Sequence, residues 1–140
     1  MANDTTTSQG LGNGVNVENI DTSKTLALAD CGVWQNVVAD GIVITLPATT
    51  AGAVFIIRNA GAAASTALAA GVSGSDGSVL VNVAPNASDK IQGLAFTAAD
   101  NKSALNTKAT ARVGDYLKLV GDGVDGWLVS EARGIWARAA

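Results

Sequence analysis

Short apolar runs separated by Gly, Asp, Asn and Pro follow one another along the chain from Ile20 onward. Successive side chains of a strand point to opposite faces, so apolar and polar residues that alternate predict a strand with one buried face. The pattern predicts strands at 24–29, 33–38, 42–46, 53–59, 78–84, 89–96, 107–113, 116–120 and 127–131. The spacing of these runs is typical of antiparallel sheets.

Individual runs predict how each strand is covered. The run 53–59, AVFIIRN, is apolar at consecutive positions, which predicts a strand covered on both faces. The run 107–113 alternates Lys, Thr and Arg with smaller side chains, which predicts a strand with one face in water. The sequence GDGVDG between 116–120 and 127–131 predicts a hairpin turn, because its glycines tolerate positive φ.

The remaining segments predict loops. Residues 98–106 are polar, and the Ala-rich stretch 61–71 is compatible either with a loop or with one short helix. Residues 1–19 are rich in Thr, Asn and Gly, which predicts a flexible N-terminal arm. Residues 20–140 are then one all-β domain: an antiparallel β-sandwich, or alternatively a small barrel.

Composition narrows the possible partners. The chain has 140 residues, of which 48% are hydrophobic and 15% charged, with a net charge of −3. So little charge predicts a surface that is partly covered by neighbouring proteins. The basic residues are scattered singly, which argues against nucleic acid as a partner. No apolar run approaches the roughly 20 residues of a membrane helix, and a single cysteine suits folding in a reducing cytoplasm.

The sequence offers little for catalysis. It contains no histidine and one cysteine, so the commonest general base, the usual nucleophile pairs and most zinc sites are excluded. We therefore expect no enzymatic activity, no catalytic residues, no metal and no cofactor. Asp122–Gly126 favours a hairpin turn over a calcium loop. Trp34, Trp127 and Trp136 favour packing in the core or at an interface over a sugar-binding platform.

Three segments resemble small virion proteins of tailed bacteriophages. They are ITLPATTAGAVFIIRNAG at 44–61, VNVAPNASDKIQG at 81–93, and NTKATARVGDYLKLVGDGVDGWLVSEARGIWARAA at 106–140. The resemblance covers roughly residues 40–140 and implies a capsid decoration, or cement, protein with a jelly-roll-like sandwich. Phage tail-fibre domains share similar motifs, so a tail-fibre or receptor- and carbohydrate-binding head is the alternative.

The resemblance also implies partners and a location. A decoration protein is made in the host cytoplasm and binds the outer surface of the virion capsid, where it bridges major capsid protein subunits of the HK97-type fold. Self-association as a dimer or trimer at symmetry axes is expected of such a subunit. Because chain termini can reach beyond a sandwich, we predict that protein contacts involve Val15, Val17, Ile20, Ile135 and Trp136.

Overall fold

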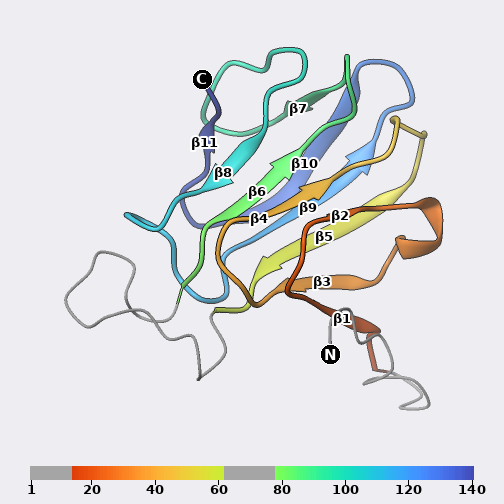
Figure 1. Ribbon diagram of the computed structural model, residues 1–140. Coiled ribbons are helices and arrows are strands. Elements are labelled where there is room, and N and C mark those ends of the chain that lie inside the picture. The colour runs from red at the N-terminus through yellow and green to blue at the C-terminus, as the bar shows by residue number, and fades with distance from the viewer. Residues whose placement is uncertain (1–13, 62–77) are drawn as a thin grey trace.

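The computed structural model describes residues 14–61 and 78–140 as two β-sheets that pack against each other (Figure 1). The strands are β1 (Val17–Ile20), β2 (Lys24–Thr25), β3 (Trp34–Val37), β4 (Ile42–Thr45), β5 (Val54–Asn59), β6 (Val81–Ala84), β7 (Lys90–Gln92), β8 (Ala104–Asn106), β9 (Tyr116–Gly121), β10 (Gly126–Arg133) and β11 (Ala137–Arg138). A single 3-10 turn, η1 (Leu28–Asp30), lies between β2 and β3. The six-stranded sheet has the order β1-β3-β5-β9-β10-β7 and the five-stranded sheet the order β11-β8-β6-β4-β2.

The first six strands form a coil. They alternate between the sheets, so that β1, β3 and β5 are parallel neighbours in one sheet while β2, β4 and β6 are parallel neighbours in the other. Each turn of the chain therefore adds one strand to each layer, as in a parallel β-solenoid. The last turn, between β5 and β6, contains residues 62–77, which lie outside the described part of the chain.

The C-terminal strands close this coil with antiparallel pairs. Strand β9 pairs with β5, and β8 pairs with β6, so each sheet of the coil is continued by a strand of opposite direction. Strands β9 and β10 form the predicted hairpin. Strand β7 then joins β10 in parallel, and β11 joins β8 in antiparallel.

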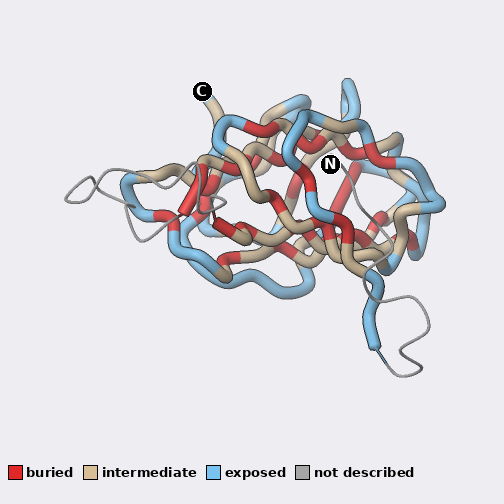
Figure 2. Tube along the Cα trace, turned by 60° about the horizontal axis from the view of Figure 1, so that its bottom comes forward, coloured by how far each residue is buried: buried red, intermediate tan, exposed pale blue. Residues whose placement is uncertain are grey.

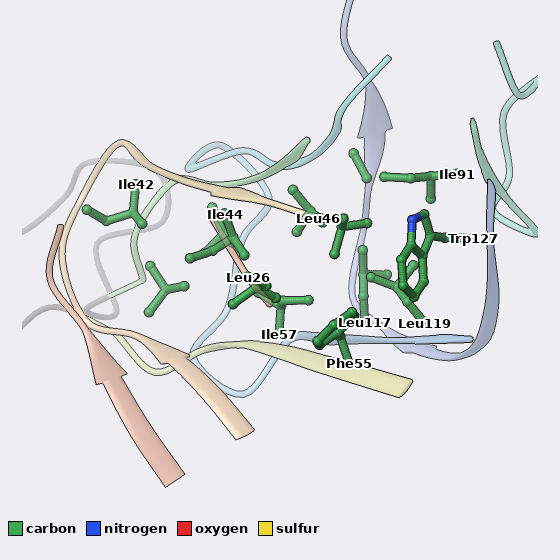
Figure 3. Packing of buried hydrophobic residues seen from close by; sticks show 14 of the residues in the cluster. Leu26, Ile42, Ile44, Leu46, Phe55, Ile57, Ile91, Leu117, Leu119 and Trp127 are labelled. Atoms are coloured by element: carbon green, nitrogen blue, oxygen red, sulfur yellow. The ribbon is translucent and has the colours of Figure 1, made fainter. Parts of the chain in front are cut away.

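The core lies between the two layers because each strand turns alternate side chains inward. In β5, β6 and β9 the buried positions alternate with partly exposed ones. Figure 2 shows buried and less buried residues interspersed along the trace. Phe55 and Trp127 meet with their ring centroids 5.2 Å apart and their planes inclined by 51°, a favourable arrangement for two aromatic rings. Figure 3 shows Trp127 near Ile91 and Leu119, while the rest of the interior is filled by aliphatic side chains that include Ile42 and Ile44 of β4, Leu26, Leu46 and Ile57.

A polar cluster borders the core beside β1 and β2, which are edge strands of the two sheets. Glu18 on β1 points inward and is buried, and Lys24 reaches it from β2 in the other sheet. Lys24 Nζ donates to Glu18 Oε2 at 2.6 Å and to Asp30 Oδ1 at 3.2 Å. Because Glu18 and Lys24 come from different sheets, this ion pair links the two layers beside the edge strand β1.

A second buried polar cluster joins the two sheets where β5 and β8 end. Asn59 Nδ2 donates to Asn106 Oδ1 at 2.8 Å, and Asn106 Nδ2 donates to Asp115 Oδ2 at 3.0 Å. Asn59 Nδ2 also donates to Val79 O, and Asn59 Oδ1 accepts from Gly61 N. The amide of Asn59 thus links Gly61 and Val79 to each other and to Asn106 in the second sheet.

The fold confirms the all-β sandwich and corrects several details of the prediction. Among the described residues, five strand pairs are parallel and four are antiparallel, so the sheets are mixed instead of antiparallel, and jelly-roll connectivity is not confirmed. Periodicity shows which face of a strand is buried but not the direction of its neighbour, which here is set by the coil.

Two local predictions also change. Residues 107–113 turn instead of forming a strand, with Ala111 N donating to Thr107 O at 2.7 Å, and the strand β8 lies just before them, inside the predicted loop 98–106. The predicted arm 1–19 overlaps β1, so Val17–Asn19 belongs to the sandwich, while residues 1–13 lie outside the described chain. The ambiguous stretch 61–71 also lies outside the described residues from position 62 onward.

Candidate interaction face

The outer surface of the six-stranded sheet carries apolar side chains across five of its strands. The strand registers place Val17, Trp34 and Ile56 in one row on β1, β3 and β5. They place Val54, Val120 and Leu128 in the next row, on β5, β9 and β10. We call these six residues the outer apolar band.

The side chains of the band point away from the core because their strand neighbours point into it. Phe55 and Ile57 alternate with Val54 and Ile56 on β5, and Leu119 precedes Val120 on β9; these inward neighbours are fully buried. The band residues themselves are partly exposed, and Leu128 is 45% exposed. When another surface covers an apolar surface that the fold leaves in contact with water, the free energy of the system falls.

The run AVFIIRN predicted a strand covered on both faces, and the structure covers only one of them. Strand β5 lies in the middle of its sheet, yet Val54, Ile56 and Arg58 face outward and are partly exposed. The sequence signal for the band was therefore present, because two-sided apolar strands require a cover on each side. Within the described residues, the second cover does not come from the chain itself.

The outer surface of the other sheet has a different character. Its rows contain Thr25, Thr45 and Ala84 on β2, β4 and β6, and Val43, Asn82 and Leu105 on β4, β6 and β8. Small and polar side chains interrupt the apolar ones, as expected for a sheet face that contacts water. The six-stranded sheet is thus the more apolar of the two outer faces.

Charged residues lie on both sides of the outer apolar band. On one side, Arg58, Tyr116 and Arg133 form a row across β5, β9 and β10. Next to this row, Lys118 and Glu131 are opposite each other on β9 and β10, and opposite charges in such a cross-strand pair attract each other. We call Arg58 and Arg133 the basic flank.

On the other side of the band, the β9–β10 turn carries Asp122 and Asp125, which we call the acidic turn. Asp122 Oδ1 accepts hydrogen bonds from the backbone N–H groups of Val124, Asp125 and Gly126 at 2.7–2.9 Å. The N–H of Gly126 and then that of Val124 hold the pKa of the Asp122 carboxyl below its ordinary value of 3.8, because they stabilise the anion. The Asp122 carboxylate therefore stays negatively charged in neutral and mildly acidic solution.

The structure separates the contact residues predicted from the sequence. Val15 is 52% exposed and precedes β1, and Ile135 is 60% exposed and follows β10 at the opposite end of the sandwich. Val17 belongs to the outer apolar band. Ile20 is fully buried and Trp136 is only 6% exposed, with its Nε1 donating to Arg133 O at 3.0 Å. These two are core residues, so their side chains do not form a contact surface in the folded domain.

The tryptophans divide in the same way. Trp127 and Trp136 belong to the core, whereas Trp34 lies on the outer apolar band. Among residues 14–61 and 78–140, no group of three or more His, Cys, Asp or Glu side chains has the arrangement needed to hold a metal ion. The same residues include no helix long and apolar enough to cross a membrane.

No protein-family model matches the chain, and no curated protein sequence matches it.

Proposed function

We propose that this chain is a structural virion protein of a tailed bacteriophage that binds the outer surface of the capsid and bridges neighbouring major capsid protein subunits. The observation that supports an attachment role is the outer apolar band, a surface that the domain does not cover with its own described residues. The resemblance of residues 40–140 to phage virion proteins supports the capsid as the place of attachment.

Attachment without chemistry suits the physical task of such a protein. Packaged DNA presses outward on a shell, and a protein that spans two subunits adds contact area that must be lost before they separate. Each contact can be modest, because many copies on one shell act together. The exposed Val15 and Ile135 lie at opposite ends of the sandwich and are the residues that we propose for contacts with two capsid subunits.

Mass spectrometry of purified virions tests this proposal through the copy number of the chain relative to the major capsid protein. Hundreds of copies per virion are expected of a protein that decorates the shell. A handful of copies would instead indicate a tail component and would refute the capsid role. Deletion of residues 1–13, which leaves β1 intact, is expected to lower capsid occupancy without unfolding the isolated domain.

One observation favours the second candidate, a tail-fibre or carbohydrate-binding head. Trp34 is partly exposed on a sheet surface, where an indole ring can stack against a sugar. A glycan array with the wild type and Trp34→Ala separates the two functions. Glycan binding that disappears in the variant would support the head domain, and absence of binding by the wild type would support the capsid role.

A further inference from the structure

The outer apolar band and its two charged flanks have an arrangement that suits binding to a second copy of the chain. The band runs from β1 and β3 through β5 to β9 and β10, with the basic flank on one side and the acidic turn on the other. When two such faces meet about a twofold axis along the band, the apolar rows of the two copies cover each other. The same rotation places the basic flank of each copy over the acidic turn of the other.

Charge complementarity makes a second copy a fitting partner. Arg58 and Arg133 carry the positive charge, and Asp122 and Asp125 carry the negative charge, so each contact is made twice in a symmetric pair. Lys118 and Glu131 are opposite each other on neighbouring strands, so they add no net charge to the face. A rotation axis across the band would place like charges together, which would cost free energy.

Face-to-face packing leaves the edge strands β1 and β7 of the six-stranded sheet unchanged and brings two sheets to the ordinary separation of about 10 Å.

The size of the face predicts the strength of the pair. Six strands spaced about 4.8 Å apart, over about five residues of 3.3 Å each, give a face of roughly 500 Å² per copy. Two copies would then bury roughly 1,000 Å², at the lower limit for a specific interface, so we expect weak pairing that depends on concentration. Copies crowded on one surface would pair, whereas dilute copies would separate.

We propose that two copies of this chain pair through the outer apolar band about a twofold axis that lies along it. The inference deepens the proposed function and rests on it only for the claim that this face binds protein. It leaves Ile135 and the outer face of the five-stranded sheet available for other contacts.

Sedimentation velocity of the purified chain between about 1 and 500 μM tests the pairing, in the concentration range expected for an interface of this size. The wild type is expected to shift from monomer to dimer. Leu128→Glu and Val120→Glu place a carboxylate in the band and are expected to weaken pairing at least about tenfold, because each copy then buries an unpaired charge. Val43→Glu makes the same change to a partly exposed valine on the other sheet and is expected to leave pairing unchanged.

A charge exchange tests the orientation of the axis. Arg133→Glu and Asp125→Arg are each expected to weaken the dimer by about threefold to tenfold, since each replaces two attractions per dimer by repulsions. The double variant, Arg133→Glu with Asp125→Arg, exchanges the two charges and is expected to restore pairing to within about twofold. Circular dichroism and thermal melting of every variant show whether the domain is folded.

The possible outcomes separate this inference from the capsid proposal. A wild type that stays monomeric at the highest concentration, or band variants that pair as well as Val43→Glu, would overturn the inference even if virions carry hundreds of copies. A double charge variant that stays weak would overturn the twofold axis along the band. A dimer with the expected variant pattern supports the inference whatever the virion copy number proves to be.

Discussion

Asn59 gives the sharpest test of how the two sheets are joined. Its side chain is fully buried at the end of β5, where Nδ2 donates to Val79 O at 2.9 Å and to Asn106 Oδ1 at 2.8 Å. Its Oδ1 accepts from Gly61 N at 3.0 Å and lies 3.4 Å from Val79 N. Replacement of Asn59 by alanine removes all of these hydrogen bonds at once and leaves the partner groups in place.

The expected cost follows from the groups that Asn59→Ala leaves behind. A buried polar group that loses its partner costs about 1–3 kcal/mol, and here the carbonyl of Val79, the N–H of Gly61 and the amide oxygen of Asn106 each lose one. Partial relaxation reduces the sum, so we expect a loss of about 3–5 kcal/mol from a total stability of about 5–15 kcal/mol. The melting temperature should fall by about 10–20 °C.

Urea denaturation, followed by tryptophan fluorescence, measures the free energy of unfolding of the wild type and of Asn59→Ala. Asn82→Ala is the matched control, because Asn82 lies on the outer side of β6 and its buried Oδ1 finds no hydrogen-bond partner among the described residues. We expect this control to change stability by less than about 1 kcal/mol. If Asn59→Ala lowers the free energy of unfolding no more than Asn82→Ala does, the hydrogen bonds of Asn59 between the sheets do not contribute to stability.

Three further predictions test the turns and the core. Gly134→Ala is expected to lower the free energy of unfolding, measured by thermal melting, by about 2–4 kcal/mol, because Gly134 has φ +93° and a Cβ there would overlap the Asp115 carboxylate. Gly52 also has a positive φ, +80°, but a Cβ there would lie in open space, so Gly52→Ala should lower this free energy by only about 1 kcal/mol. Equal losses would contradict this steric explanation. The lowered pKa of Asp122 means that its ionised form stabilises the fold above about pH 4 and that this contribution is lost as the pH falls through the folded-state pKa. The melting temperature of the wild type should therefore fall more steeply between pH 5 and about pH 2 than that of Asp122→Asn, with Asp125→Asn as a control in the same turn; parallel curves for the wild type and Asp122→Asn would contradict it. Trp127→Ala should lower the free energy of unfolding in urea by about 3–5 kcal/mol and Trp127→Phe by much less, because the buried Nε1 has no partner among the described residues and the phenylalanine retains a ring contact with Phe55. Equal losses for the two variants would show that this ring contact does not contribute to stability.

Local pattern alone determined much of the fold. The alternation in the predicted strand 78–84 agrees with β6, where Val81 and Val83 point inward, because side-chain direction along a strand depends only on position. The glycines and aspartates of GDGVDG identified the β9–β10 hairpin, because turn geometry is a local property of those residues. The pattern failed at 107–113, where the alternation is real but Asn106 and Asp115 anchor the segment in a turn.

The tertiary structure decided what periodicity cannot express. Which strands become neighbours, and in which direction, depends on how the chain returns across the core, so the coil of β1 to β6 with its parallel pairs was not visible in the sequence. The apolar run at 53–59 predicted that both faces of its strand would be covered, but only the folded sheet shows that one face is left outward beside Trp34 and Val120. The sequence therefore indicated that this strand is apolar on both faces, and the structure determined where the second apolar face lies, because only the strand registers bring the separate apolar residues together.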